Sequence, residues 1–216
     1  MLSLEPAALT SEKRADAEST SYSSNNKRRL VHVYTGNGKG KTTAALGLAL
    51  RAVGHGLSVY IIQFMKGSSH SGEFQASRTV LPQMRVEQYG RSCPFYEQLK
   101  AGNFTCEGCL ACFKPAQKTD ESDARDALNA AYFAVRSGKY DLVVLDEINV
   151  AVSKGLVDKS AALELISTKA PRTELVMTGR NASPEVISAA DLVTEMREVK
   201  HPFRVAQVFS RQGIEY

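Results

Sequence analysis

Apolar and polar residues along this chain form a repeating pattern of strand-like and helix-like segments. Runs rich in β-branched or other apolar residues occur at 30–34, 58–64, 84–89, 140–147, 173–180 and 191–196. Segments with the apolar spacing of helices lie between them, at 41–53, 120–138, 160–168 and 183–190. This alternation predicts one α/β domain in three layers, in which helices cover both faces of a mostly parallel central sheet.

The first 28 residues differ from the rest of the chain. They are rich in Ser, Asn, Glu and Lys and have little apolar periodicity, so they bury too little surface to order themselves. We expect a flexible tail at 1–28, with a short helix that docks on a partner subunit as the alternative, and a single domain over 29–216.

Composition narrows the class of protein. The chain has 216 residues, 43% of them hydrophobic, and a formal net charge of +4 that is spread along its length. This size suits one domain with a substantial core, and the dispersed charge gives no indication of nucleic-acid binding. No run approaches the roughly 20 apolar residues of a membrane span, and no apolar signal core opens the chain. We therefore expect a cytoplasmic protein without membrane or nucleic-acid partners.

A glycine-rich turn joins the first predicted strand to the first predicted helix. Residues 35–42 read TGNGKGKT, which fits a phosphate-binding loop except that Thr35 stands where the standard pattern has glycine. Glycines let successive backbone N–H groups approach phosphate oxygens, Lys41 can neutralise their charge, and the Thr42 hydroxyl can bind Mg²⁺. The alternative is an ordinary glycine-rich turn, but the flanking strand and helix favour a nucleotide site.

Two acidic residues follow the buried segment YDLVVL. Asp146 and Glu147 close this strand, where P-loop folds present a carboxylate to magnesium. The pattern favours a metal role for one of the two, without saying which, over a pair of surface acids that end a strand. By themselves, these residues predict a site for ATP or GTP but no particular reaction, so the protein could still be a hydrolase or a kinase.

Five blocks along residues 30–216 carry a resemblance to a known family. They are TGNGKGKTTAALGLALRAVGHG, VYIIQFMKG with Gly72-Glu73, YDLVVLDEINVAV, Thr178-Gly179-Arg180, and the closing VKHPF with AQ and GIEY. In order and spacing they resemble the corrinoid adenosyltransferases of cobalamin synthesis and salvage, which implies a P-loop NTPase-like (RecA-like) fold. The resemblance also implies transfer of the 5′-deoxyadenosyl group of ATP to Co(I) of cobalamin or of cobyrinic acid a,c-diamide, with release of triphosphate.

The resemblance also implies roles for particular residues. Because the cobalt supplies the nucleophile, the protein needs only to orient ATP and to stabilise the leaving triphosphate. The expected catalytic residues are Lys41, Thr42 and Glu147, and the expected magnesium ligands are Thr42 with Asp146 or Glu147. The expected ATP- or corrinoid-binding residues are Gly36, Asn37, Gly38, Lys39, Gly40, Lys41, Thr42, Thr43, Gln63, Lys66, Glu73 and Arg180.

The chain departs from the family after the third predicted strand. Aromatic residues that crowd the lower face of the cobalt in family members are expected there, but 88–96 reads QYGRSCPFY, with Arg and Cys near those positions. Tyr89, Phe95 or Tyr96 can substitute for them. The way in which the axial ligand of cobalt is displaced, and the preferred corrinoid, therefore stay open.

A cysteine-rich insertion lies at about 90–117. Cys106, Cys109 and Cys112 have C-x2-C-x2-C spacing, and Cys93 precedes them. Four thiolates can hold a structural zinc or an iron–sulfur cluster, and unligated thiols are the third alternative. A cluster would be of interest because the reaction needs an electron to reach Co(II).

Two further functions compete with adenosyl transfer. One is a P-loop NTPase or kinase of another class, and the other is a non-catalytic carrier of nucleotide or corrinoid. By family likeness we also expect a homodimer and an electron-donor protein of the flavodoxin or ferredoxin kind. None of the four histidines is expected to carry chemistry, and His201 is expected to be structural.

Overall fold

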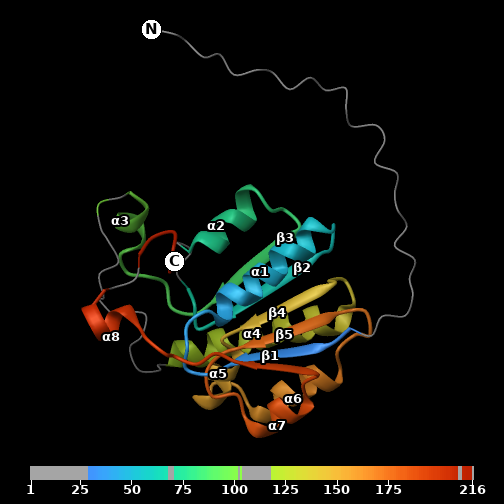
Figure 1. The fold of residues 1–216 in the computed structure, drawn as a ribbon. Helices are drawn as coiled ribbons and strands as arrows, with labels where there is room; N and C mark the ends of the chain where they lie inside the picture. Colours follow the sequence, from blue (N-terminus) through green and yellow to red (C-terminus); the bar gives the residue numbers. More distant parts are fainter. Residues whose placement is uncertain (1–28, 68–70, 102, 104–117, 209–210, 216) are drawn as a thin grey trace, which may run out of the picture.

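The structure is a computed structural model that describes residues 29–67, 71–101, 103, 118–208 and 211–215. Six parallel strands form one sheet in the order β3-β2-β4-β5-β1-β6 (Figure 1). The strands are β1 (Val31–Thr35), β2 (Val59–Phe64), β3 (Met84–Tyr89), β4 (Leu142–Asp146), β5 (Glu174–Thr178) and β6 (Leu192–Glu195). The predicted parallel sheet is therefore confirmed.

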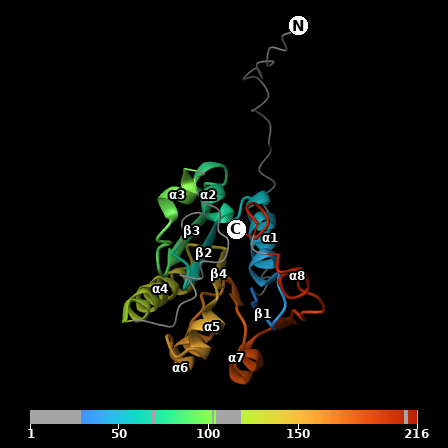
Figure 2. The same ribbon diagram turned by 90° about the vertical axis from the view of Figure 1, so that its left-hand side faces the viewer.

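Helices cover both faces of this sheet, as expected (Figure 2). Their bounds are α1 (Lys41–Gly54), α2 (Gly72–Thr79), α3 (Tyr96–Lys100), α4 (Lys118–Ser137), α5 (Ile148–Ser153), α6 (Lys159–Ser167), α7 (Pro184–Ala189) and α8 (Pro202–Ala206). Apolar residues of α1 and α2 pack on one face, and those of α4, α5, α6 and α7 pack on the other. The result is the three-layer arrangement that the sequence predicts.

Strand burial explains why the central segments are so apolar. Every residue of β2 and β4 is buried, because strands inside a sheet covered on both faces meet apolar side chains above and below. Alternate residues of β2 supply the two cores: Tyr60, Ile62 and Phe64 face α4, whereas Val59 and Ile61 face α1. The short helices α2, α3, α5 and α8 were not predicted, since most of them have too few turns to show helical periodicity.

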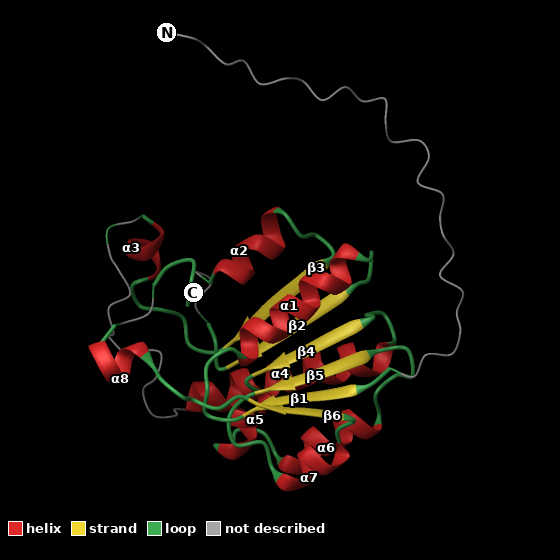
Figure 3. Ribbon diagram, viewed as in Figure 1, coloured by secondary structure: helices red, strands yellow, loops and turns green. Residues whose placement is uncertain are grey.

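All six strands point the same way, so their carboxyl ends share one edge of the sheet (Figure 3). The glycine-rich loop lies at this edge, between β1 and α1, and the turn after Asp146 follows β4 there. Helices α3 and α8 also lie beyond this end of the strands (Figure 3). Ligands of open α/β sheets bind at this edge, so the fold brings the candidate residues to one place.

The segment after β6 packs directly on the glycine-rich loop. The Gly38 N–H donates to the Met196 carbonyl at 2.7 Å, and the Glu198 N–H donates to Asn37 Oδ1 at 3.1 Å. A Cβ at Gly36 or Gly38 would come within 3 Å of the backbone of this segment. The absence of a side chain at these two glycines therefore leaves room for the segment after β6. The sequence pattern indicated only that the loop backbone could approach phosphate closely.

Within the described residues, no helix is long and apolar enough to cross a membrane. Residues 1–28 and most of the cysteine-rich insertion lie outside those residues.

Gly38→Ala is expected to lower the free energy of unfolding by about 2 kcal/mol, because the new methyl group would overlap the backbone of Met196 and Arg197. Gly47→Ala is the matched control: Gly47 lies in α1 with nothing near its Cβ position, so alanine should raise stability by up to ~1 kcal/mol. Urea unfolding of the nucleotide-free proteins measures both. Equal stability of the Gly38→Ala protein and the wild type would contradict this packing.

Candidate functional site

The N-terminus of α1 is built to attract an anion. Gly40 precedes the helix with a φ of 113°, a conformation that favours glycine. The first N–H groups of a helix lack partners inside it, and the helix dipole makes this end positive. The first turn of α1 contains no acidic residue that would offset this positive end. The loop thus has the backbone geometry of a phosphate site.

Lys41 is folded back into the loop. Its side chain is buried, and its Nζ donates to the carbonyl oxygens of Gly36 at 2.8 Å and Gly38 at 2.6 Å. Burial lowers the pKa of Lys41, an effect that the charge of Glu147 opposes. These bonds hold a cation at the centre of the loop, where the negative charge of a phosphate would lie.

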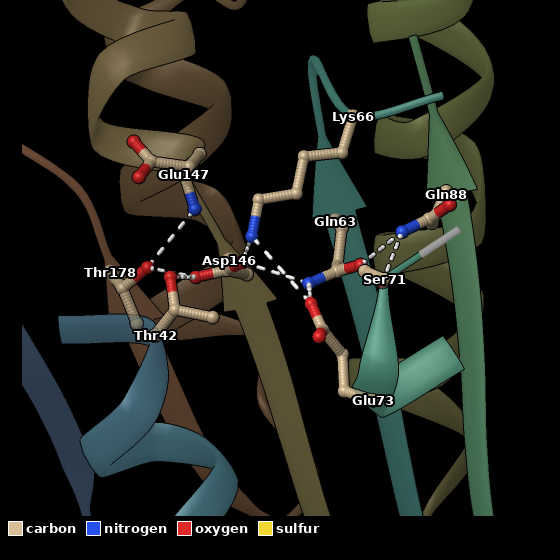
Figure 4. Close-up of polar contacts among 9 residues, drawn as sticks. All are labelled: Thr42, Gln63, Lys66, Ser71, Glu73, Gln88, Asp146, Glu147 and Thr178. Carbon is tan, nitrogen blue, oxygen red and sulfur yellow. Dashed lines mark hydrogen bonds and ion pairs between the residues drawn. The ribbon is translucent and has the colours of Figure 1, made fainter. Parts of the chain in front are cut away.

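Asp146 is the centre of a polar network at the end of β4 (Figure 4). Its Oδ1 accepts hydrogen bonds from the hydroxyls of Thr42 at 2.9 Å and Thr178 at 2.6 Å. Its Oδ2 accepts from Lys66 Nζ at 2.7 Å and Gln63 Nε2 at 3.1 Å. Burial alone would raise the pKa of Asp146, but the Lys66 charge and the hydrogen bonds from Lys66, Thr178 and Thr42 hold it below its usual value. Asp146 is therefore an ionised, fully buried carboxylate.

Glu147 directly follows Asp146 in the chain, but its side chain points in another direction (Figure 4). The strand ends at Asp146, one residue earlier than predicted, and Glu147 has a left-handed φ of 64° that starts α5. Its N–H donates to Thr178 Oγ1 at 3.0 Å, while its carboxylate points away from the Asp146 network (Figure 4). Burial, and then the charge of Asp146, raise the pKa of Glu147. The two adjacent acids thus have opposite electrostatic environments.

Gln63 connects Asp146 to a second carboxylate. Its Nε2 donates to Glu73 Oε1 at 3.0 Å as well as to Asp146, so both amide hydrogens are used. Gln88 fixes the orientation of this amide by donating to Gln63 Oε1 at 2.8 Å, and it also donates to Ser71 Oγ at 3.2 Å. The network therefore spans β2, β3, β4 and the start of α2.

An open cavity of about 580 Å³ lies above this network. Its lining includes the predicted residues Asn37, Gly38, Lys39, Gly40, Lys41, Thr42, Thr43, Lys66, Glu73, Glu147 and Arg180. Gly36, Gln63 and Asp146 are not in the lining, and Gln63 and Asp146 are buried beneath it. The structure thus brings the predicted residues of five separate segments to a single cavity.

Several residues of the site were missed by sequence reasoning. Thr178 closes β5 and holds Asp146, and the available signals were its place at a strand end and in the Thr178-Gly179-Arg180 block. Gln88 and Ser71 gave no signal, since polar residues at such positions are common. His201, Gly213, Ile214 and Glu215 also line the cavity, and Glu215 pairs with Lys39 at 2.6 Å. His201 also accepts from the N–H of Phe203 at the start of α8.

The hydroxyl of Thr42 and the carboxylates of Asp146 and Glu147 are hard oxygen ligands of the kind that Mg²⁺ prefers. The described part of the chain contains no group of three or more His, Cys, Asp or Glu side chains placed to hold a metal, so a magnesium site here would also need the threonine and nucleotide oxygens.

Most of the cysteines that could bind a metal lie outside the described residues. Cys93 is a half-buried free thiol, and Cys106, Cys109 and Cys112 lie beyond the described residues.

Several known proteins that are similar to this chain are named corrinoid adenosyltransferase. It is 33% identical to a corrinoid adenosyltransferase of Sinorhizobium over 97% of this chain and 91% of that one. A Pseudomonas aeruginosa protein of the same name is 32% identical with the same coverage, and one from Salmonella typhimurium is 35% identical over 88% and 86%. Among solved structures, domain III of Thermotoga maritima DnaA gives a TM-score of 0.33 at 14% identity over 80% of this chain and 56% of that one, which is too loose to support an argument.

The family described as ATP:corrinoid adenosyltransferase BtuR/CobO/CobP matches residues 27–216. This match, together with the relatives that share 32–35% identity over most of the chain, shows that the chain belongs to the ATP:corrinoid adenosyltransferase family.

Proposed function

We propose that this chain transfers the 5′-deoxyadenosyl group of ATP to the cobalt of a reduced corrinoid. The electron pair of Co(I) forms the Co–C bond, the bond between C5′ and its oxygen breaks, and the bonding pair leaves with inorganic triphosphate. The observation that carries the proposal is the phosphate-type loop with a buried lysine, in a chain whose family match covers residues 27–216. No serine or cysteine nucleophile is needed, because the corrinoid supplies the attacking atom.

The task of the protein is to hold the leaving group. The backbone amides of the loop and of the first turn of α1 would bind the triphosphate, with Gly36 to Thr43 as the proposed set. Gly38 contributes its amide only if its bond to Met196 opens. An ammonium group has three N–H donors, and Lys41 uses two on loop carbonyls, which leaves one for a phosphate oxygen. Preorganised charge of this kind stabilises the negative charge that develops on the leaving group.

Magnesium would be held by Thr42 with Asp146 or Glu147. When bound, it would neutralise part of the triphosphate charge. Asp146 keeps the Thr42 hydroxyl in place, and Glu147 and Arg180 line the same cavity, so each can contact the nucleotide or its metal.

The corrinoid itself is proposed to be cobalamin or cobyrinic acid a,c-diamide. Tyr89, Phe95 and Tyr96 are half-buried, and Phe95 and Tyr96 lie at the start of α3, beyond the carboxyl ends of the strands (Figure 1). Tyr89 donates its hydroxyl to Glu87 at 2.7 Å. Phe95 and Tyr96 are therefore better placed than Tyr89 to meet the face of a corrinoid.

Three further features belong to the same proposal. A one-electron donor of the flavodoxin or ferredoxin kind would reduce Co(II) to Co(I), which suits a reducing cytoplasm. A homodimer is supported by the edge strand β6, whose four residues are all exposed. Zinc or an iron–sulfur cluster at Cys93, Cys106, Cys109 and Cys112 is supported by their spacing alone, and elemental analysis of anaerobically purified protein tests it.

One assay separates the competing functions. Protein, MgATP and chemically reduced cobalamin are mixed in the dark, and a light-sensitive alkylcobalamin spectrum together with triphosphate is the expected result. Release of phosphate or ADP without corrinoid would indicate an NTPase or kinase. Binding of both ligands without a Co–C bond would indicate a carrier.

Lys41→Ala is expected to lower kcat/KM by roughly 100- to 1,000-fold, the loss typical of removing one preorganised group that stabilises charge in the transition state. The same assay measures it. Lys154→Ala, at an exposed lysine outside the cavity, is the control and should react like the wild type. A Lys41→Ala enzyme with near-normal turnover would remove the proposed role of the loop.

Glu147→Gln is expected to stabilise the metal-free protein at pH 7 by up to about 1 kcal/mol. The folded state raises the pKa of Glu147, so its ionised form is disfavoured by folding. That penalty grows as pH rises from the unfolded pKa to the raised folded pKa, and it is absent below both. The stabilising effect should therefore vanish near pH 4, and chemical denaturation at the two pH values measures it. A destabilised variant at pH 7 would show that the carboxylate has a favourable partner.

A further inference from the structure

Lys66 occupies the one replaceable position around Asp146. A carboxylate accepts about four hydrogen bonds, and Asp146 already accepts four, from Thr42, Thr178, Gln63 and Lys66. Its carboxylate is therefore saturated within the described structure. A metal ion can bind it directly only if one of the four donors leaves.

The four donors differ in how easily they can leave. Thr178 and Gln63 are fully buried, and Gln63 is also held by Glu73 and Gln88. Thr42 lies in the first turn of α1 and is itself a proposed metal ligand. Lys66 is the only charged donor, and its side chain is 32% exposed and lines the cavity. Displacement of Lys66 breaks the fewest buried contacts.

The backbone beside Lys66 is closely packed, so displacement of this residue is expected to involve its side chain. Met65 has a positive φ of 58°, and Gly67 packs so closely on Gly90 and Arg91 that a Cβ there would overlap their backbone. The lysine stem is flexible. A second acceptor is nearby, because Glu73 Oε1 lies 4.0 Å from Lys66 Nζ.

We propose that Lys66 is a resident counter-ion of Asp146 that gives way to the divalent metal and then pairs with Glu73 or with the triphosphate. This inference rests on the proposed function, since it assumes a metal at Thr42 and Asp146. In the metal-free protein the ammonium group compensates the buried carboxylate. When the metal supplies the positive charge that compensates Asp146, the Lys66 ammonium is displaced. It then adds a positive charge to the part of the cavity where negative charge develops on the leaving triphosphate. Lys66 is thus a positioning residue for both the metal and the phosphates.

The test measures binding of Mn²⁺ alone to the nucleotide-free protein, by the EPR signal of free Mn²⁺. Lys66→Met removes the competing cation, so its affinity for Mn²⁺ should be about tenfold or more tighter than that of the wild type. Lys66→Arg keeps the competing charge and should bind Mn²⁺ no more tightly than the wild type. Lys154→Met is the control: Lys154 is exposed and lies outside the cavity, so its loss should leave Mn²⁺ affinity unchanged.

A second readout is thermal stability. Without metal, the Lys66→Met protein should unfold at a lower temperature than the wild type, and Mn²⁺ should restore more stability to it than to the wild type or to the Lys154→Met protein. Unchanged Mn²⁺ affinity in the Lys66→Met protein, an equal gain in the Lys154→Met protein, or a Lys66→Met protein that stays unfolded with Mn²⁺ would overturn the proposal.

Mn²⁺ binding to the wild-type protein in the presence of ATP distinguishes a failure of this inference from a failure of the proposed function. Mn²⁺ bound with ATP in the wild type, together with no effect of Lys66→Met, overturns the exchange and leaves the metal site standing. No Mn²⁺ bound with ATP in any variant contradicts the metal site and the exchange with it.

Discussion

A buried negative charge at the end of β4 organises this protein. The Asp146 carboxylate is out of contact with water and ionised, which is costly unless cations and hydrogen-bond donors surround it. Its donors come from α1, β5, β2 and the turn after β2. One side chain therefore fixes the relative positions of the phosphate loop and three neighbouring strands. Loss of any donor would leave the carboxylate undercompensated, so the network constrains the whole carboxyl edge of the sheet.

The same electrostatics gives the two adjacent acids different tasks. Asp146 is ionised and accepts four hydrogen bonds, so in the metal-free protein it anchors the donors around it. Glu147 is turned toward the cavity by its left-handed backbone, and its carboxylate is disfavoured in the ionised form. A cation in the cavity would relieve that cost. The charges of Lys66, Lys41 and Arg180 offset only part of the cost of burying Glu147 beside Asp146, an arrangement suited to receiving a nucleotide together with a metal.

The sequence predicted the sheet and the glycine-rich turn between β1 and α1 because both depend on local patterns. The fully apolar runs of β2 and β4 and the glycines before α1 are visible without long-range information. What could not be predicted depends on contacts between distant segments. The pairing of Gly38 with Met196 joins residues that lie far apart in the chain, and the roles of Gln88 and Ser71 arise only when β3 lies beside β2. Glu147 was placed in the strand because its left-handed turn has no sequence signature of its own.

The central claim is that the triphosphate and its metal meet at the loop above Asp146. Crystals grown with ATP and Mn²⁺ test it most directly, through the anomalous signal of manganese. The account predicts a manganese peak beside Thr42 Oγ1 and the carboxylate of Asp146 or Glu147, with the phosphates on the amides that begin α1. A manganese peak away from these residues, or ATP bound elsewhere with the loop amides unoccupied, would contradict it.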